Sequence, residues 1–152
     1  MSKKLLVIVA VLTFVLSTVS VGMAQDKEAN KAVSDKVTSM VAAAKKAVKT
    51  VPADAVKKAI DSKEKAIILD VRDGEEFAAG HLPGAKNISR GTLEFKVAKE
   101  IPDTNTKIYV YCKTIARSAM ATKTLNDLGY KNAVLMNAKY EDWVKAGHPV
   151  ER

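Results

Sequence analysis

The chain contains one cysteine, Cys112, and its neighbours have the types and spacing that activate a thiol. The stretch YVYCKTIARSAMATKTL begins with β-prone residues and ends with alanine and leucine at helical spacing, so Cys112 stands where a strand gives way to a helix. Unsatisfied backbone N–H groups and the positive end of the helix dipole converge at such a place and favour the thiolate. Arg117, expected in the first turn of the helix, adds a planar fork of donors, and Lys113 adds a second cation.

A thiolate surrounded by amides and cations can attack an electrophile, carry a transferred group or hold an anion nearby. Only the residues KTIA separate Cys112 from Arg117. That ring is small, and it suits one sulfur atom added to Sγ better than a tetrahedral phosphate. The competing interpretation is a buried structural thiol, because free cysteine is among the most buried residue types.

The N-terminus has the features of an export signal. Two lysines precede an almost wholly apolar run over residues 5–16, and small residues precede a cleavage site before Gln25. We therefore predict a signal peptide over residues 1–24 and a periplasmic or secreted mature protein. The alternative is an uncleaved membrane anchor, because residues 5–24 are almost long enough to span a bilayer.

The composition restricts the partners. The formal net charge is +8, and removing the two lysines of the signal peptide leaves about +6, which favours small anions or acidic surfaces. Nucleic acid is not expected, because the lysines are scattered and no aromatic residues interleave with them. No metal is expected either, because two histidines and one cysteine offer no metal-ligand spacing.

Strand-like and helix-like segments alternate along the rest of the chain. The expected strands are residues 65–73, 85–88, 107–112 and 132–136. The expected helices are residues 52–60, 74–80, 91–101, 118–128 and 140–146. This alternation predicts an α/β fold with a mostly parallel sheet and helices on both faces. Ligands of such sheets bind beyond the C-terminal ends of the strands, where Cys112 is expected to lie.

An amphipathic helix is expected before this unit, because apolar residues recur every three or four positions among lysines over residues 27–49. It can pack on the domain, pair with a second subunit or tether the chain to a membrane surface. The first two are favoured, because its apolar face is small and lacks Trp and Phe. We therefore divide the chain into a signal peptide (1–24), a helical extension (25–50) and one domain (51–152).

The ordered segments LDVRDGEEFAAGHLPGAKNIS, YVYCKTIARSAMATKTLNDLGY and EDWVKAGHPV resemble the rhodanese-like sulfurtransferases. The resemblance covers residues 51–150. NISRGTLE and CKTIAR, after a lysine- and alanine-rich lead-in, are most similar to the single-domain periplasmic polysulfide-sulfur transferases of the Sud type. The resemblance implies a single rhodanese-like domain with a five-stranded parallel sheet, in which Cys112 accepts a sulfane sulfur and becomes a persulfide.

The same resemblance assigns the substrate-binding residues. The six-residue loop CKTIAR matches the sulfur-binding loop of the family, and the related phosphatases carry one residue more. Its members are Cys112, Lys113, Thr114, Ile115, Ala116 and Arg117. Arg72 and Arg90 are implied to complete the pocket for anionic sulfur.

Other roles are open for some of these polar residues. Arg72 has nearby acidic residues (Asp73, Glu75 and Glu76) as alternative partners, and Arg90 can be a solvated loop charge. Asp70 is expected to be a structural acceptor, because sulfur transfer needs no carboxylate to move a proton. His81 stands among turn residues and is expected to shape a loop.

The chain departs from the family pattern at two places. Many members have glycine as the fourth loop residue, where this chain has Ile115, and a glycine pair where it has Ala138 and Lys139. If the loop requires a positive φ at residue 115, a β-branched side chain there is strained. Ala138 and Lys139 are expected to narrow or charge the pocket wall.

The predicted activity is sulfur transfer from polysulfide, or from thiosulfate, to a thiophilic acceptor. Cys112 is itself the covalent carrier, so no bound cofactor is expected. The expected partners are small anionic sulfur species, a sulfur- or polysulfide-reducing membrane enzyme and, by resemblance, a second copy in a homodimer. The alternatives are a non-catalytic sulfur carrier and, disfavoured by the short loop and the lack of a second cysteine, a cysteine phosphatase or arsenate reductase.

Overall fold

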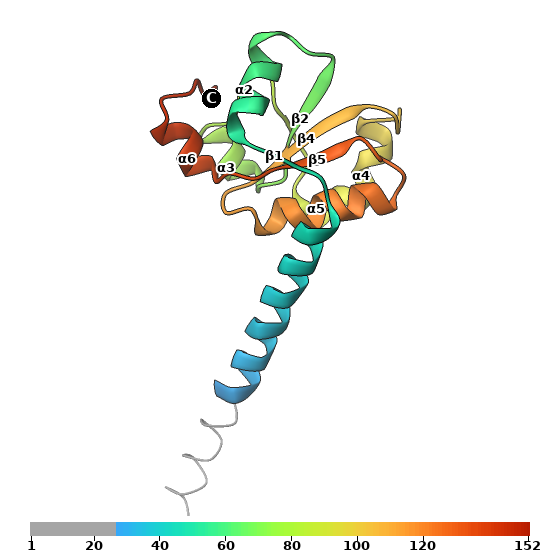
Figure 1. The fold of residues 1–152 in the computed structure, drawn as a ribbon, viewed down its shortest axis with the longest axis vertical. Helices are drawn as coiled ribbons and strands as arrows, with labels where there is room; N and C mark the ends of the chain where they lie inside the picture. The colour runs from blue at the N-terminus through green and yellow to red at the C-terminus, as the bar shows by residue number, and fades with distance from the viewer. Residues whose placement is uncertain (1–26) are drawn as a thin grey trace, which may run out of the picture. The chain divides into compact units, whose positions relative to one another are not determined.

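The computed structural model describes residues 27–152, in which five parallel strands form one sheet (Figure 1). The strands are β1 (Thr50–Val51), β2 (Ala66–Asp70), β3 (Lys86–Asn87), β4 (Lys107–Tyr111) and β5 (Ala133–Met136). Their order across the sheet is β1-β5-β4-β2-β3, and every pairing is parallel. The predicted α/β class and five-stranded parallel sheet are confirmed.

Helices connect these strands. They are α2 (Ala53–Asp61), α3 (Gly74–Ala78), the short 3-10 helix η1 (Arg90–Thr92), α4 (Leu93–Glu100), α5 (Ala116–Asp127) and α6 (Tyr140–Lys145). Each expected helix of the domain is present. The helix α5 begins two residues earlier than expected, which places Arg117 inside its first turn.

One strand lacks any signal in the sequence. The edge strand β1 has two residues, of which Thr50 pairs with Leu135 and Val51 pairs with Met136. It ends at Pro52, which cannot donate a hydrogen bond to a ladder. So short a segment shows no periodicity, and its place is set by pairing with β5 rather than by its own residues.

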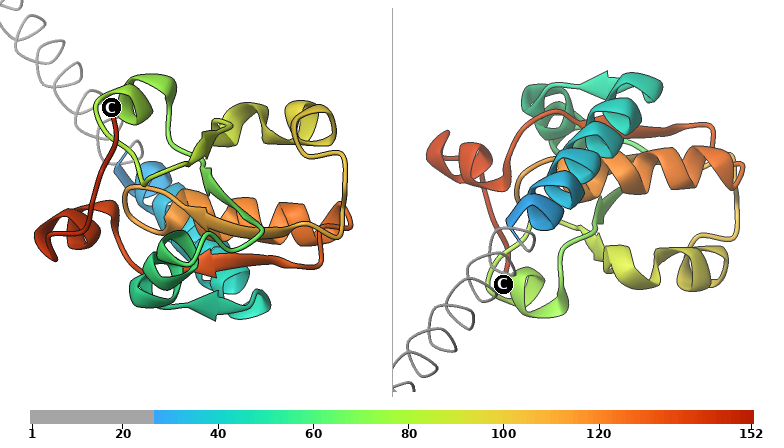
Figure 2. Two further views of the ribbon diagram at one scale, coloured as in Figure 1. Left: turned by 90° about the horizontal axis from the view of Figure 1, so that it is seen from above. Right: turned by 90° about the horizontal axis from the view of Figure 1, so that it is seen from below.

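Two apolar layers lie on opposite faces of the sheet. Leu69 and Val110 pack with the side chains of α4 and α5, whereas Ile68 and Tyr109 pack with those of α2 and α6. Figure 1 shows α2 and α5 on opposite sides of the sheet, and Figure 2 shows α4 and α5 side by side. Because neighbouring strand residues alternate between two buried faces, the central strands read as continuous apolar runs.

A helix over residues 27–47 precedes the sheet, so the expected amphipathic helix is present and ends two residues early. Val33 and Val37 are exposed to solvent, with 64% and 51% of their surface accessible. Residues 40–152 form one compact unit, in which Ala44 is buried against Ala119 and Leu135. The predicted signal peptide, residues 1–24, lies outside the described residues.

Among residues 27–152, none of the helices has both the length and the apolar character that a membrane crossing requires.

Candidate active site

Cys112 follows β4 directly and lies at the C-terminal edge of the sheet, beside the end of β2. Its side chain is fully buried. The backbone N–H of Ser118 donates to Sγ over 3.3 Å, and the thiol donates to Ser118 Oγ over 3.3 Å. The Ser118 hydroxyl in turn donates to the carbonyl oxygen of Ile115 (2.9 Å). The sulfur thus accepts a hydrogen bond from a helix N–H and donates one to a hydroxyl oxygen.

The sequence does not single out Ser118 as a contact of the sulfur. The motif C-x4-R-S contains it directly after Arg117, and that adjacency is the signal that could have found it. Ile115 is the N-cap of α5, and Ser118 lies in the first turn of that helix, from which its N–H reaches the sulfur.

Ile115 adopts a left-handed conformation, with φ 80° and ψ −32°, at the N-cap of α5. A β-branched residue in this region costs on the order of 1–3 kcal/mol of strain. The sequence predicted strain at residue 115 if the loop requires a positive φ there, and the structure shows that positive φ. Lys113 and Thr114 are exposed on the outer side of the loop, and Ala116 and Arg117 are half-buried.

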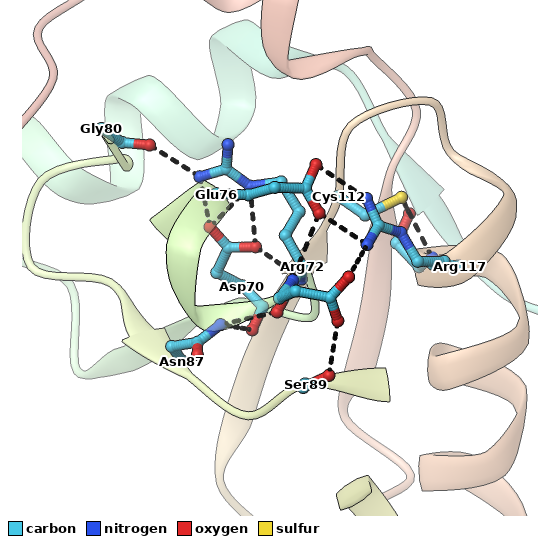
Figure 3. Close-up of polar contacts among 10 residues, drawn as sticks. Asp70, Arg72, Glu76, Gly80, Asn87, Ser89, Cys112 and Arg117 are labelled. Carbon is cyan, nitrogen blue, oxygen red and sulfur yellow. Dashed lines mark hydrogen bonds and ion pairs between the residues drawn. The ribbon is translucent and has the colours of Figure 1, made fainter. Parts of the chain in front are cut away.

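Arg117 is held by two carboxylates of the α3 segment (Figure 3). Its Nη1 and Nη2 atoms donate to Glu76 over 2.7 and 3.0 Å, and Nη1 also reaches Asp73 over 3.2 Å. The hydrogen bonds with Glu76 are the main reason that the pKa of Arg117 is raised and the pKa of Glu76 is lowered. The charge that the Cys112 sulfur carries as a thiolate is a further cause of the raised pKa of Arg117, so the guanidinium lies within electrostatic reach of the sulfur.

Arg72 is buried in a different set of contacts. Its Nε and Nη2 atoms donate to Asp70 Oδ2 over 2.9 and 2.6 Å, and Nη2 also donates to the carbonyl of Gly80 over 2.7 Å. The guanidinium lies 4.0 Å from the ring centre of Tyr140 and 5.6 Å from that of Tyr111. Burial opposes its charge, but hydrogen bonds and the charge of Asp70 outweigh this and raise the pKa of Arg72.

The partner of Arg72 is thus Asp70, rather than the three acidic residues weighed from the sequence. Asp70 acts as the structural acceptor that was expected of it, with no exposed surface. Asn87 ties the same strand end together, because its Nδ2 donates to the carbonyls of Asp70 (3.1 Å) and Arg72 (2.9 Å).

Arg90 points to another part of the domain. Its Nη1 atom donates to Glu94 over 2.8 Å and its Nη2 atom to Thr124 Oγ1 over 3.3 Å. It lines a pocket with Met120 and Lys123 of α5. The structure therefore does not bring its guanidinium together with those of Arg72 and Arg117.

A pocket of about 290 Å³ opens beside the cysteine loop. Its lining residues are Arg72, Glu76, Ala79, Gly80, Lys113, Tyr140 and Glu141. The carbonyl of Lys113 accepts from the backbone N–H of Tyr140 (3.2 Å), so the start of α6 is fixed to the loop. Ala138 and Lys139 are absent from the lining, contrary to the expectation that they form its wall.

His81 lies in the loop after α3. Its Nδ1 atom is 3.0 Å from the carbonyl oxygen of Phe77, and the two rings stack with their centres 3.8 Å apart. This is a loop-shaping arrangement. Within residues 27–152, no three His, Cys, Asp or Glu side chains gather in a way that could hold a metal ion.

Comparison with known proteins places these features in one family. The rhodanese-like domain family matches residues 52–146. YrkF of Bacillus subtilis, a candidate sulfur carrier protein, is 38% identical over 90 residues, which make up 59% of this chain and 48% of that protein. The chain spans only 48% to 61% of the length of the first three curated relatives that it matches.

Two solved structures extend the comparison. The polysulfide-sulfur transferase homodimer of Wolinella succinogenes is 30% identical with a TM-score of 0.67, and the match covers 78% of this chain and 88% of that one. A Rhodopseudomonas palustris protein of unknown function, named as a tyrosine phosphatase candidate, is 27% identical with a TM-score of 0.70, covering 76% and 93%.

Proposed function

Because the chain belongs to the rhodanese-like domain family, we propose that it is a sulfurtransferase that carries sulfane sulfur on Cys112. The Cys112 thiolate attacks the terminal sulfane sulfur of polysulfide or, as a second donor, of thiosulfate. The sulfur–sulfur bond of the donor breaks, and its electron pair leaves with the shortened anion. A thiophilic acceptor such as cyanide, sulfide or a protein then attacks the outer sulfur of the persulfide, and the Cys112 thiolate is restored.

The observation that carries this proposal is that the backbone N–H of Ser118, directly after the six-residue loop, donates to Cys112 Sγ over 3.3 Å. A backbone N–H at a helix start stabilises negative charge without moving. Sulfur transfer makes such charge twice, on the attacking thiolate and on the thiolate released by the acceptor. The same short ring supports sulfur transfer over a phosphatase activity, since the phosphatases carry a loop one residue longer.

Arg117 and Lys113 supply the cations of the site in this proposal. The pairing of Arg117 with Glu76 leaves its planar fork oriented but partly neutralised. An anionic donor therefore binds near a weak net positive charge rather than near an unpaired guanidinium. Arg72 lines the adjoining pocket and shapes it, with its charge offset by Asp70.

The second candidate is a non-catalytic carrier, which the likeness to YrkF favours. A carrier loads sulfur on Cys112 by the same chemistry and releases it only to a docked protein. Turnover with a small acceptor separates the two.

The setting of the reaction is also a proposal. An export signal over residues 1–24 makes the protein periplasmic or secreted, where polysulfide and a sulfur-reducing membrane enzyme are suitable partners. The exposed apolar residues Val33 and Val37 suit contact with a second copy in a homodimer, and the similar Wolinella succinogenes protein is a homodimer.

The test is the intact mass of the protein after mixing with polysulfide and then with cyanide. We expect added masses of about 32 Da, one per sulfur atom, that require Cys112 and are discharged as thiocyanate over many turnovers. Cys112→Ser is the matched variant, because it changes one atom. Sulfur that loads and stays in the presence of cyanide identifies the carrier. If neither polysulfide nor thiosulfate loads sulfur on the protein, the sulfurtransferase and carrier proposals are both refuted.

A further inference from the structure

Ile115 is the one strained point of the cysteine loop. Among the described residues, only Ile115 and Lys63 combine a side chain with a positive φ. A residue held in such a conformation persists when its surroundings fix it more firmly than its own preference opposes it. The contacts of Ile115 therefore show what holds the loop.

The side chain of Ile115 packs on a small apolar cluster that contains the end of the N-terminal helix. Ala44, Ala119 and Leu135 form the buried centre of this cluster, and Val48 packs against it together with Ile115. The carbonyl of the next residue, Lys49, accepts from the backbone N–H of Leu135 over 2.9 Å. Ala44, Val48 and Lys49 thus lie against Leu135 of β5, and Ile115 packs on the same apolar cluster.

The backbone of Ile115 leads from this cluster to the sulfur. Its carbonyl accepts from the N–H of Ala119 (2.8 Å) and from the hydroxyl of Ser118 (2.9 Å). That hydroxyl also receives the hydrogen bond of the Cys112 thiol. Cys112 itself packs in a different apolar cluster, with residues of α4 and the central strands, so direct packing does not join it to Val48.

We infer that Ala44, in the last turn of the N-terminal helix, and Val48, directly after that helix, are positioning residues for Cys112. They hold Ile115 in its left-handed conformation, and the Ile115 carbonyl and the Ser118 hydroxyl transmit that geometry to Sγ. The inference deepens the proposed function, because it makes sulfur loading depend on a segment outside the cysteine loop. A partner that shifts the end of this helix changes the reactivity of the thiol.

A double-mutant cycle tests the coupling, with Val48→Ala, Ile115→Gly and the double variant in the full chain. The readouts are the rate of alkylation of Cys112 by iodoacetamide and the single-turnover rate of sulfur loading from polysulfide, both at neutral pH. Val48→Ala is expected to change each rate by about threefold or more in the parent chain, and by less than about 1.5-fold beside Ile115→Gly. Glycine adopts a positive φ without strain, so a glycine at position 115 does not need Val48 to hold the loop in this conformation.

The controls separate positioning from general loss of stability. Val134→Ala removes the same atoms from a half-buried valine that packs in the layer on α2 and α6, and it should leave both rates unchanged. Val48→Ile, which keeps an apolar side chain on the cluster, should show the alkylation and loading rates of the parent. If Val48→Ala does not fold, Val48→Thr takes its place in the cycle.

The inference is overturned if the position-48 variant has the same effect with and without Ile115→Gly, or has none in the parent chain, or if Val134→Ala matches it. Alkylation does not require a sulfur donor. If the parent chain fails to load sulfur, the proposed function falls, and the alkylation cycle still decides the role of Val48.

Discussion

Replacing Ser118 by alanine tests how the site stabilises its sulfur. Ser118 contributes two groups within 3.3 Å of Sγ, a backbone N–H that alanine keeps and a hydroxyl that it removes. When Cys112 ionises, the hydroxyl can rotate from the Ile115 carbonyl to donate to the thiolate. The carbonyl then remains satisfied by the N–H of Ala119.

The size of the effect follows from these contacts. A hydrogen bond to a charged group contributes about 1.5–3 kcal/mol, and the Ser118 side chain is fully buried, so water cannot replace it freely. Loading of sulfur should therefore slow by about ten- to hundredfold in Ser118→Ala. The free energy of unfolding should fall by only about 1 kcal/mol, because the Ile115 carbonyl keeps the hydrogen bond from Ala119 and only the thiol of Cys112, a weak donor, loses its acceptor.

The assay is the single-turnover loading rate, followed by quenched intact-mass measurement, beside a urea unfolding curve. Thr122→Ala is the matched control. Thr122 has a buried hydroxyl one turn further along α5 that donates to the Ser118 carbonyl over 2.7 Å and does not contact the sulfur. It should lose similar stability and load at the parent rate. A Ser118→Ala protein that loads within twofold of the parent refutes the role of the hydroxyl.

Three further predictions concern the arginines. Arg117→Lys keeps the charge but loses the bidentate contact with Glu76, so the KM for an anionic donor should rise by about three- to tenfold in steady-state assays. An unchanged KM shows that Arg117 does not bind the donor. The pKa of Glu76 is lowered by Arg117, so their pair stabilises the fold at pH values above the ordinary carboxyl pKa. This contribution should disappear as the pH falls through the lowered pKa. Unfolding curves of Glu76→Gln should therefore show a smaller loss of stability on acidification than those of the parent. Asp70→Asn leaves the charge of Arg72 buried and uncompensated, so the free energy of unfolding should fall by about 3–5 kcal/mol, and a loss below 1 kcal/mol in urea contradicts a structural ion pair.

The central part of the fold could be predicted because its elements carry their own signals. β2 and β4 are continuous apolar runs, and α5 ends at a glycine, so burial on both faces and helix boundaries were visible in the residues. The edge strand β1 could not be found, because two residues have no period and their pairing is supplied by β5.

The site shows the same division between local and tertiary information. Cys112 was identifiable because the change from strand to helix and the spacing to Arg117 are both local in sequence. The direction of a long side chain is harder to predict, because several acceptors compete for it. Arg72 has acidic residues on both sides in the sequence and turns toward Asp70, where it also meets the Gly80 carbonyl. Arg90 pairs with Glu94 and also reaches Thr124, which only the fold brings near.

The two edges of the sheet are as short as strands can be, with two residues in β1 and two in β3. An open edge offers unpaired N–H and C=O groups on which another chain can add a strand. Here each edge strand offers such groups from only two residues, and Pro52 directly after β1 has no N–H to extend the pairing. The domain is therefore protected against edge-to-edge aggregation, and recruitment of other proteins by strand addition is disfavoured.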